Sequence, residues 1–163
     1  MRKSAVAVIL GIDPGKTGGW TVLDETGALL RWGRSDKMDE RDLADTIADL
    51  TIQFPGLYAV MERAQAFPKQ GVSSVFTYGT GYGFRRGLLC AERIGFETVP
   101  PRTWQKSLGM ENRGKLTKPQ HKRALIAAAR SRWPSLPSHS GVCDAALIAE
   151  YGRRKMSGKA AVE

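Results

Sequence analysis

The sequence has few cysteines, few histidines and no long apolar run. Its two cysteines, Cys90 and Cys143, each lie in an apolar stretch, so we expect small core side chains in a reducing compartment and no disulfide. Two histidines and two separated cysteines do not make a zinc site. No stretch approaches the ~20 apolar residues of a membrane span, and the apolar run at 4–12 leads directly into a turn at 13–15, unlike a signal peptide. We therefore expect a soluble cytoplasmic protein.

Acidic residues are scarce relative to basic ones. The 163 residues include 25 Lys and Arg against 16 Asp and Glu, which gives a net charge of +9 spread along the whole chain. This balance favours a polyanionic partner, although a merely soluble basic protein is the simpler alternative. The length fits one domain, which we expect over residues 1–155, with a frayed tail at 156–163.

The apolar pattern predicts an α/β domain. We expect strands at 5–12, 20–24, 28–35, 57–61 and 96–99, helices at 39–53, 72–94, 102–108, 120–133 and 140–154, and a polar basic loop at 112–119. Three strands, a helix, a strand, a helix and a strand, followed by helices, is the order of an RNase H-like fold. The predicted architecture is therefore a mixed five-stranded sheet flanked by helices.

Three glycines recur every fourth residue in the long helix predicted at 72–94. Gly79, Gly83 and Gly87 lie on one face of that helix, and each costs about 1 kcal/mol relative to alanine. Such a stripe predicts that another backbone comes very close to this face. We favour packing against protein, either the sheet or a partner helix, over contact with a phosphate chain.

Three carboxylates stand at the ends of apolar elements. Asp13 ends the first predicted strand, Glu62 follows the fourth, and Asp144 lies in the last helix with apolar residues at i+3, i+4 and i+7. A charged carboxylate turned toward a core is costly unless its charge is compensated, and no basic partner is obvious in these runs. Mg²⁺ prefers such oxygen ligands, and two ions can stabilise the attacking and leaving oxygens of a phosphodiester displacement. One such residue alone would be explained by a turn or cap, whereas three together favour a metal site.

The segments around these carboxylates resemble the RuvC family of Holliday junction resolvases. Gly11-Ile12-Asp13-Pro14-Gly15 resembles its opening motif, Val60-Met61-Glu62 its second acidic strand, 71–88 its glycine-containing helix and 143–149 its C-terminal acidic motif. The resemblance covers residues 5–152 and is closest to the small phage-type branch.

The resemblance implies an RNase H-like fold, a homodimer and two Mg²⁺ or Mn²⁺ ions per active site, held by Asp13, Glu62 and Asp144. The implied activity is that of a crossover junction endodeoxyribonuclease, which hydrolyses DNA phosphodiesters in paired nicks across a four-way junction. The implied setting is the cytoplasm of a bacterium or of a phage-infected host.

One position departs from the family pattern. The family has a fourth acidic or histidine ligand shortly before the last aspartate, whereas Ser140 stands one helical turn before Asp144 here. Three interpretations stay open. Ser140 is only an N-cap, His139 replaces the missing ligand or carries a proton, or the second metal binds weakly.

A DNA-binding surface is predicted after the second acidic strand. The expected phosphate contacts are Lys69, Arg85, Arg86, Arg102, Lys106, Arg113, Lys115, Lys118 and Lys122. Any one of them alone could be an ordinary surface charge. Phe67 lies in a polar segment, where it either wedges into the open centre of a junction or folds back on the core.

Two other functions compete with junction resolution. The absence of an acidic residue at Ser140 suggests a catalytically weakened or non-catalytic protein that binds branched DNA. Another RNase H-like nuclease, acting on RNA hybrids or from strand ends, is the second alternative, because a fold does not fix a substrate.

Overall fold

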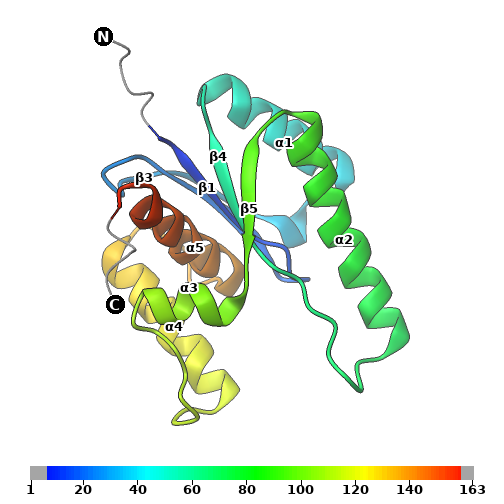
Figure 1. Cartoon of the computed structure of the whole chain (residues 1–163), viewed down its shortest axis with the longest axis vertical. Helices are drawn as coiled ribbons and strands as arrows, with labels where there is room; N and C mark the ends of the chain where they lie inside the picture. Colours follow the sequence, from blue (N-terminus) through cyan, green and yellow to red (C-terminus); the bar gives the residue numbers. More distant parts are fainter. Residues whose placement is uncertain (1–6, 159–163) are drawn as a thin grey trace.

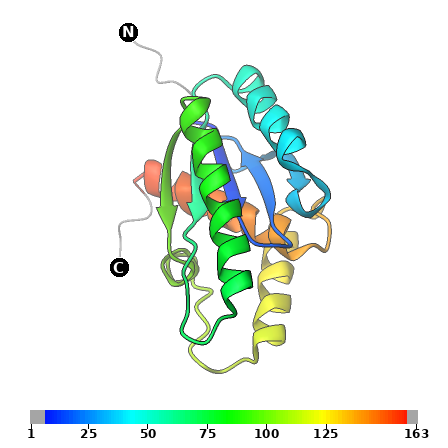
Figure 2. The ribbon, with the colours of Figure 1, turned by 90° about the vertical axis from the view of Figure 1, so that its right-hand side faces the viewer.

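The computed structural model describes residues 7–158, which build one central sheet with helices on both faces (Figures 1 and 2). The strands are β1 (Ile9–Asp13), β2 (Gly19–Leu23), β3 (Leu29–Arg34), β4 (Tyr58–Glu62) and β5 (Gly95–Val99), in the spatial order β3-β2-β1-β4-β5. β1, β2 and β3 form an antiparallel meander, while β4 lies parallel to β1 and β5 parallel to β4. The predicted mixed five-stranded sheet is confirmed.

Helices cover the two faces of the sheet unequally. They are α1 (Glu40–Gln53), α2 (Val72–Ala91), α3 (Pro101–Ser107), α4 (Lys118–Arg132) and α5 (Ser140–Met156), with a short 3₁₀ turn η1 (Ser35–Lys37). In Figure 1, α1 and α2 lie on one side of the sheet and α3, α4 and α5 on the other. No helix among residues 7–158 is long and apolar enough to cross a membrane.

The predicted element order is correct, but several helix ends differ from the prediction. α4 begins at Lys118 rather than 120, because the Thr117 hydroxyl and the Gln120 side chain form a reciprocal cap and Pro119 is tolerated in the first turn. α2 ends at Ala91, three residues early, just before Arg93 adopts a φ of 56°. α5 continues two residues past 154. Residues 5–6 of the predicted first strand and 159–163 of the predicted tail lie outside the described residues.

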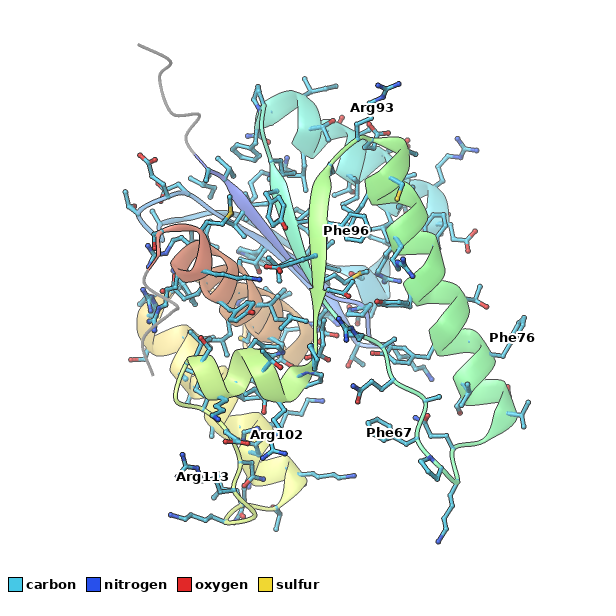
Figure 3. All side chains as sticks on the ribbon, viewed as in Figure 1. Phe67, Phe76, Arg93, Phe96, Arg102 and Arg113 are labelled. Atoms are coloured by element: carbon cyan, nitrogen blue, oxygen red, sulfur yellow. The ribbon has the colours of Figure 1, made fainter. Side chains whose placement is uncertain are left out.

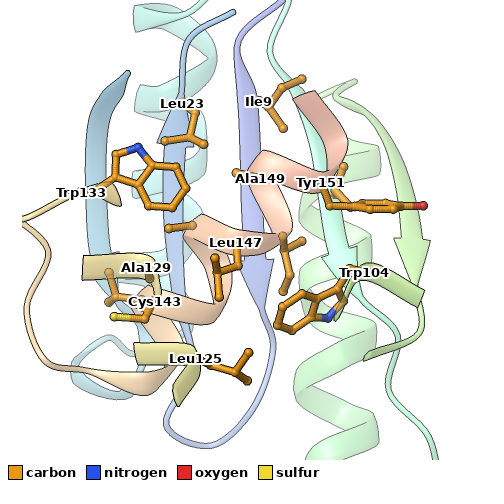
Figure 4. Packing of buried hydrophobic residues seen from close by; sticks show 14 of the residues in the cluster. Ile9, Leu23, Trp104, Leu125, Ala129, Trp133, Cys143, Leu147, Ala149 and Tyr151 are labelled. Carbon is orange, nitrogen blue, oxygen red and sulfur yellow. The ribbon is translucent and has the colours of Figure 1, made fainter. Parts of the chain in front are cut away.

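Strand side chains alternate between two cores, as the period of two requires. Ile9 packs in one core with Trp104 and with Leu147 of α5 (Figure 4). Val60 belongs to the same core. On the other face, Leu10, Met61 and their neighbours pack against α1 and α2. The sheet is therefore buried on both sides, which fixes the register of its strands.

Helix α5 lies unusually close to the sheet, because glycines occupy the contact. A Cβ atom at Gly11 would stand 1.9 Å from the carbonyl oxygen of Ala145, and one at Gly141 would stand 2.2 Å from that of Thr17. The Thr21 hydroxyl donates to the Val142 carbonyl at 3.0 Å. The first turns of α5 are thus held against β1 and β2.

A buried carboxylate stabilises the C-terminal half of α5 through ion pairs. Glu150 is 1% exposed and pairs with Arg132 at 2.8 Å, Arg153 at 2.7 Å and Arg154 at 2.6 Å. Burial alone would raise the pKa of Glu150, but hydrogen bonds from Arg153 and Arg154 outweigh it and hold the pKa below its usual value. Arg153 also donates to the Glu25 carbonyl, so the cluster ties α4, α5 and the β2–β3 turn together.

The outer face of α2 is open, so the backbone predicted to approach its glycines is not the sheet of the same chain, while a partner helix stays a prediction. A Cβ at Gly79, Gly83 or Gly87 would meet nothing within 4 Å, so no other part of residues 7–158 packs against the glycine stripe. Val72 and Phe76 stand on the same face, and Phe76 points away from the rest of the molecule (Figure 3). Cys90, expected in the core, is exposed on this helix, whereas Cys143 is buried as predicted; neither is in a disulfide.

Candidate active site

Two carboxylates lie side by side where parallel strands end. Asp13 and Glu62 are the last residues of β1 and β4, and the pairing of Ile12 with Met61 places them at the same level. Strand alternation turns both toward the face covered by α5. Asp144 reaches this face from the second turn of α5, which Gly11 and Gly141 allow to come close. The structure thus brings together the three carboxylates that the sequence singled out.

The ionisation of these groups shows that they share one site. Burial raises the pKa of Asp13. Burial and then the charge of Asp13 raise the pKa of Glu62 to about 7. Burial, followed by the charges of Asp13 and Glu62, raises the pKa of Asp144 well above its usual value. Each carboxylate is costly to ionise beside the others, so the site demands positive charge.

Hydrogen bonds orient two of the three carboxylates. Asp13 Oδ1 accepts from the backbone N–H of Gly15 at 2.9 Å, and Glu62 Oε2 accepts from the indole N–H of Trp104 at 2.8 Å. Asp144 Oδ1 is buried and has no hydrogen-bond partner among the described residues. Such an orphaned buried oxygen needs a partner of another kind, and a cation is one that suits a carboxylate.

The carboxylate oxygens of Asp13, Glu62 and Asp144 suit a hard divalent cation, although they are not close enough together to coordinate one ion. Among residues 7–158, no three Asp, Glu, His or Cys side chains stand close enough as they are to hold one ion. The fit to a metal rests instead on the charge of Asp13, which raises the pKa of Glu62, on the charges of both, which raise the pKa of Asp144, and on the unpartnered oxygen of Asp144. Carboxylate oxygens are the ligands that Mg²⁺ and Mn²⁺ prefer.

Basic groups and a tyrosine from α2 and α4 surround the carboxylates. The charges of Arg85 and Lys122 act to lower the pKa of Asp13, and Lys122 does the same for Asp144. Arg85, predicted among the DNA contacts, is partly buried; its Nη1 donates to the Gly81 carbonyl at 3.0 Å and its Nε has no partner among the described residues. Burial and then the charges of Glu62 and Asp13 raise the pKa of Tyr78 to about 12, so its hydroxyl stays a donor.

The N-cap of α5 is His139, which corrects the interpretation of Ser140 as a cap. His139 Nδ1 accepts from the Val142 N–H at 3.2 Å, and Nε2 lies 3.4 Å from Asp36 Oδ1. Both ring nitrogens are therefore used, and a metal ion at His139 would have to break one of these contacts. Ser140 is the first residue of the helix, one turn before Asp144, so its position relative to Asp144 is as predicted.

The predicted DNA contacts other than Arg85 are exposed. Arg102 and Arg113 flank Glu111 at 2.7 Å and 3.9 Å. Arg113, Lys106 and Lys115 line a hollow of about 580 Å³ between the loop after α3 and α4. Figure 3 places Arg102 and Arg113 at the same end of the molecule as Phe67. Phe67 is 60% exposed, so it does not fold back on the core.

Two residues at the site escaped the sequence analysis. Trp104 belongs to a short, basic helical turn, and nothing in its neighbourhood indicates that it contacts a carboxylate 42 residues away. Tyr78 lies in the glycine-striped helix, one residue before Gly79. Its place on the inner face, two turns before Arg85, was the available signal.

Comparisons with known structures reveal the same fold in DNA-processing enzymes. The RuvC structure of Thermus thermophilus covers 93% of this chain and 97% of its own length, with 17% identity and a TM-score of 0.62. The T. thermophilus RuvC in complex with Holliday junction substrate gives a TM-score of 0.67 at 17% identity, with 93% and 96% covered. The yeast mitochondrial Holliday junction resolvase Ydc2 gives 0.55 at 17% identity, with 91% and 78% covered.

This chain has the RNase H-like fold of the RuvC resolvases. The large terminase nuclease of thermophilic phage G20c shares it as well, with a TM-score of 0.51, 15% identity, and 90% and 82% covered. No protein-family model matches the sequence, and no curated protein does. The fold expected from the sequence is therefore confirmed, while the activity has to be argued from the site.

Proposed function

We propose that this chain is a divalent-metal-dependent endonuclease that cuts branched DNA and resolves Holliday junctions. The observation that carries the proposal is the group of three buried carboxylates: Asp13 and Glu62 end β1 and β4, and Asp144 lies on α5, where the charges of the other two raise its pKa. The substrate class is suggested by the T. thermophilus RuvC structure, which contains a Holliday junction. Cleavage of a four-way junction, compared with a linear duplex and an RNA–DNA hybrid in the same metal, tests it.

Asp13, Glu62 and Asp144 would hold the metal. Two bound Mg²⁺ or Mn²⁺ ions would supply a nucleophile from water and stabilise the leaving oxygen. The Gly15 N–H and the Trp104 indole limit how far Asp13 and Glu62 can turn. Lys122 and Tyr78 are available to hold the phosphate beside the carboxylates, the first by charge and the second as a hydrogen-bond donor.

The exposed basic residues would hold the DNA arms. Contacts with phosphates supply affinity for DNA without recognising its sequence. The residues that can make them are Lys69, Arg86, Arg102, Lys106, Arg113, Lys115 and Lys118. Phe67 is a large apolar side chain left in water beside them, and such a ring can insert between unstacked bases. Its exposure favours the wedge over the alternative of a loop residue packed on the core.

A catalytically weak protein is the second candidate, because Ser140 brings no charge to the position one turn before Asp144. Three carboxylates hold two close cations less well than four, since the cations repel each other. We predict that the chain binds junctions but cuts them slowly, or only in millimolar Mn²⁺, and that Ser140→Asp raises the cleavage rate at least tenfold, about 1.4 kcal/mol in barrier.

Single-turnover cleavage of a labelled four-way junction measures this effect of Ser140→Asp. Ser138→Asp is the matched control, because it adds the same charge before the helix on an exposed residue. An unaltered chain that already cuts rapidly in Mg²⁺, together with a slower Ser140→Asp variant, would show that another group completes the site.

The outer face of α2 is the proposed contact of a homodimer, in which two active sites would face the two strands to be nicked. Val72 is 87% and Phe76 is 75% exposed, and the open glycines beside them allow a second helix to approach closely. We predict a dimeric mass by light scattering for the unaltered chain and a monomeric mass for Phe76→Asp, because a buried charge would break an apolar contact.

Ile52→Asp is the control for the Phe76 variant. Ile52 is 79% exposed on α1, so the substitution adds the same charge to an exposed apolar residue of another helix. It is expected to remain dimeric. A monomeric unaltered chain that cuts junctions in both strands would rule out the dimer, and a dimeric Phe76→Asp variant would move the contact to another face.

A further inference from the structure

A small cavity lies between the sheet and the helices α1 and α2. It leaves about 10 Å³ for the centre of a water-sized sphere, which is close to what one small buried group needs. Isoleucines and leucines of β1, α1 and α2 make up most of its wall. The polar side chains of the wall are Trp20 of β2, Ser35 of η1 and Arg85 of α2. Three different elements therefore bring a polar group to one apolar cavity.

Each of these three side chains has a buried atom without a partner. Trp20 Nε1, Ser35 Oγ and Arg85 Nε make no hydrogen bond within residues 7–158. The whole residues Trp20 and Ser35 are only 3% and 8% exposed. In the same part of the chain, one other buried side-chain nitrogen or oxygen lacks a partner, Asp144 Oδ1 at the carboxylates. Buried polar atoms are nearly always paired, so three unpaired ones around one cavity indicate an occupant.

The three atoms reach the cavity from well-fixed backbone. A Cβ at Gly33 would stand 2.7 Å from Trp20 Nε1, so the N–H edge of the indole lies against β3, two residues before Ser35. The backbone N–H of Ser35 donates to the Gly18 carbonyl at 3.0 Å, which holds η1 beside β2. Arg85 Nη1 donates to the Gly81 carbonyl of its own helix, and this leaves Nε for the cavity.

The chemistry of these atoms favours a small anion over water. The N–H groups of Trp20 and Arg85 can only donate, and the Ser35 hydroxyl can donate as well. A chloride ion accepts from all three, whereas a water molecule would bring two hydrogens to a wall that offers one side-chain acceptor, the same hydroxyl.

The charge of Arg85 also favours an anion. No salt bridge joins Arg85 to a carboxylate in the described part of the chain, and Asp13 acts on it by charge without a hydrogen bond. A partly buried guanidinium is costly unless an opposite charge compensates it. An anion at Nε would supply that charge.

We infer that Trp20, Ser35 and Arg85 form a binding site for one monovalent anion of the size of chloride, which holds α2 to the sheet. In α2, Leu89 alone is buried, so few apolar contacts fix this helix. An anion shared by Arg85, Trp20 and Ser35 joins the same half of α2 to β2 and η1. This site is independent of the proposed nuclease function, because its three donors are not the carboxylates.

A crystal grown in sodium bromide locates the ion directly, because bromide scatters X-rays anomalously at its absorption edge. We expect an anomalous peak within hydrogen-bond distance of Trp20 Nε1, Ser35 Oγ and Arg85 Nε. Density at this position without an anomalous peak would be water and would overturn the inference.

Thermal unfolding at constant ionic strength measures the binding in solution. Chloride replaces gluconate stepwise, and gluconate is too large to enter the cavity. The unfolding midpoint should rise to a plateau, by roughly 3–6 °C when chloride is at ten times its dissociation constant. A midpoint that does not rise, or that rises without a plateau, would mean that a bromide peak reflects binding at crystal concentration only, and the inference would fail.

Ser35→Ala is the main variant, because it removes one donor and adds no bulk. Half of the chloride effect should then need at least tenfold more chloride, since hydrogen bonds to a charged acceptor are strong. In gluconate the variant should be at least as stable as the unaltered chain, because it deletes an unpaired buried hydroxyl. Trp20→Phe, which removes the N–H and keeps a ring, should weaken the chloride effect in the same way.

Ser107→Ala is the matched control for Ser35→Ala. Ser107 is exposed at the end of α3, so the same substitution there should keep the full response to chloride. Equal responses to chloride in Ser35→Ala, Trp20→Phe and Ser107→Ala would show that the ion does not bind at these donors and would overturn the inference.

Discussion

Asp13→Asn and Glu62→Gln are expected to abolish cleavage while leaving junction binding nearly unchanged. Each amide keeps the shape and the oxygen that accepts from Gly15 or Trp104, so the fold is preserved and only the charge is lost. Without that charge the metal is held poorly, and the single-turnover rate should fall at least 100-fold, about 2.7 kcal/mol in barrier. Near-normal Mg²⁺-dependent cleavage by Asp13→Asn would remove this residue from the site.

The same amides are expected to stabilise the metal-free protein. The folded-state pKa of Glu62 is raised to about 7, so the folded state binds its proton more tightly than the unfolded chain. Ionisation of Glu62 therefore destabilises the folded state. This destabilisation is absent below pH ~4.5 and reaches its full size above pH ~7. In urea unfolding with EDTA, the advantage of Glu62→Gln over the unaltered chain should grow across this pH range. A constant difference would mean that the carboxylates do not strain the fold.

Gly11→Ala is expected to destabilise the protein by about 3 kcal/mol or more, and with it the active site. The new Cβ would lie 1.9 Å from the Ala145 carbonyl oxygen and 2.7 Å from the Ala149 nitrogen, so two backbones rather than a flexible side chain would have to separate. Because this contact brings Asp144 to Asp13, cleavage should fall even in protein that remains folded. The midpoint of urea unfolding should decrease with an unchanged slope.

Gly95→Ala is the matched control for Gly11→Ala. Gly95 lies in β5 of the same sheet, and its Cβ would stand 3.2 Å from a ring carbon of Tyr58, a partly exposed side chain that can shift. Alanine also lowers the entropy lost by the chain on folding, by about 0.5–1 kcal/mol relative to glycine. Stability should therefore change little. A mild effect at Gly11 equal to that at Gly95 would contradict the close contact between α5 and β1.

The carboxylates were predictable because their position follows from local rules. Asp13 and Glu62 each end an apolar strand, and parallel strands place their carboxyl ends at one edge of the sheet. Asp144 lies on the apolar face of a helix that the pattern of apolar residues reveals. Trp104 was not predictable, since its hydrogen bond to Glu62 depends on how α3 returns to the sheet after β5.

The glycine stripe of α2 shows how far the energetic cost of glycine in a helix can predict packing. The cost of three aligned glycines in a helix predicts close packing against another backbone, yet within the described chain nothing packs there. Composition can indicate that a face is kept free of side chains, but it does not say whether the neighbour belongs to the same molecule. His139 is a similar case: it caps α5 beside Ser140, a residue type with a stronger capping preference, because its ring also reaches Asp36 from η1.

The central claim is that the coupled carboxylates cut branched DNA in a metal-dependent reaction. The most direct measurement is the cleavage rate of one four-way junction, one linear duplex of the same sequence and one RNA–DNA hybrid, each with millimolar Mg²⁺ or Mn²⁺ and with EDTA. We predict paired nicks in the junction, at least tenfold faster than any cut in the other two substrates, and none in EDTA. Equal or faster cleavage of the duplex or hybrid, or junction cleavage that persists in EDTA, would contradict the account.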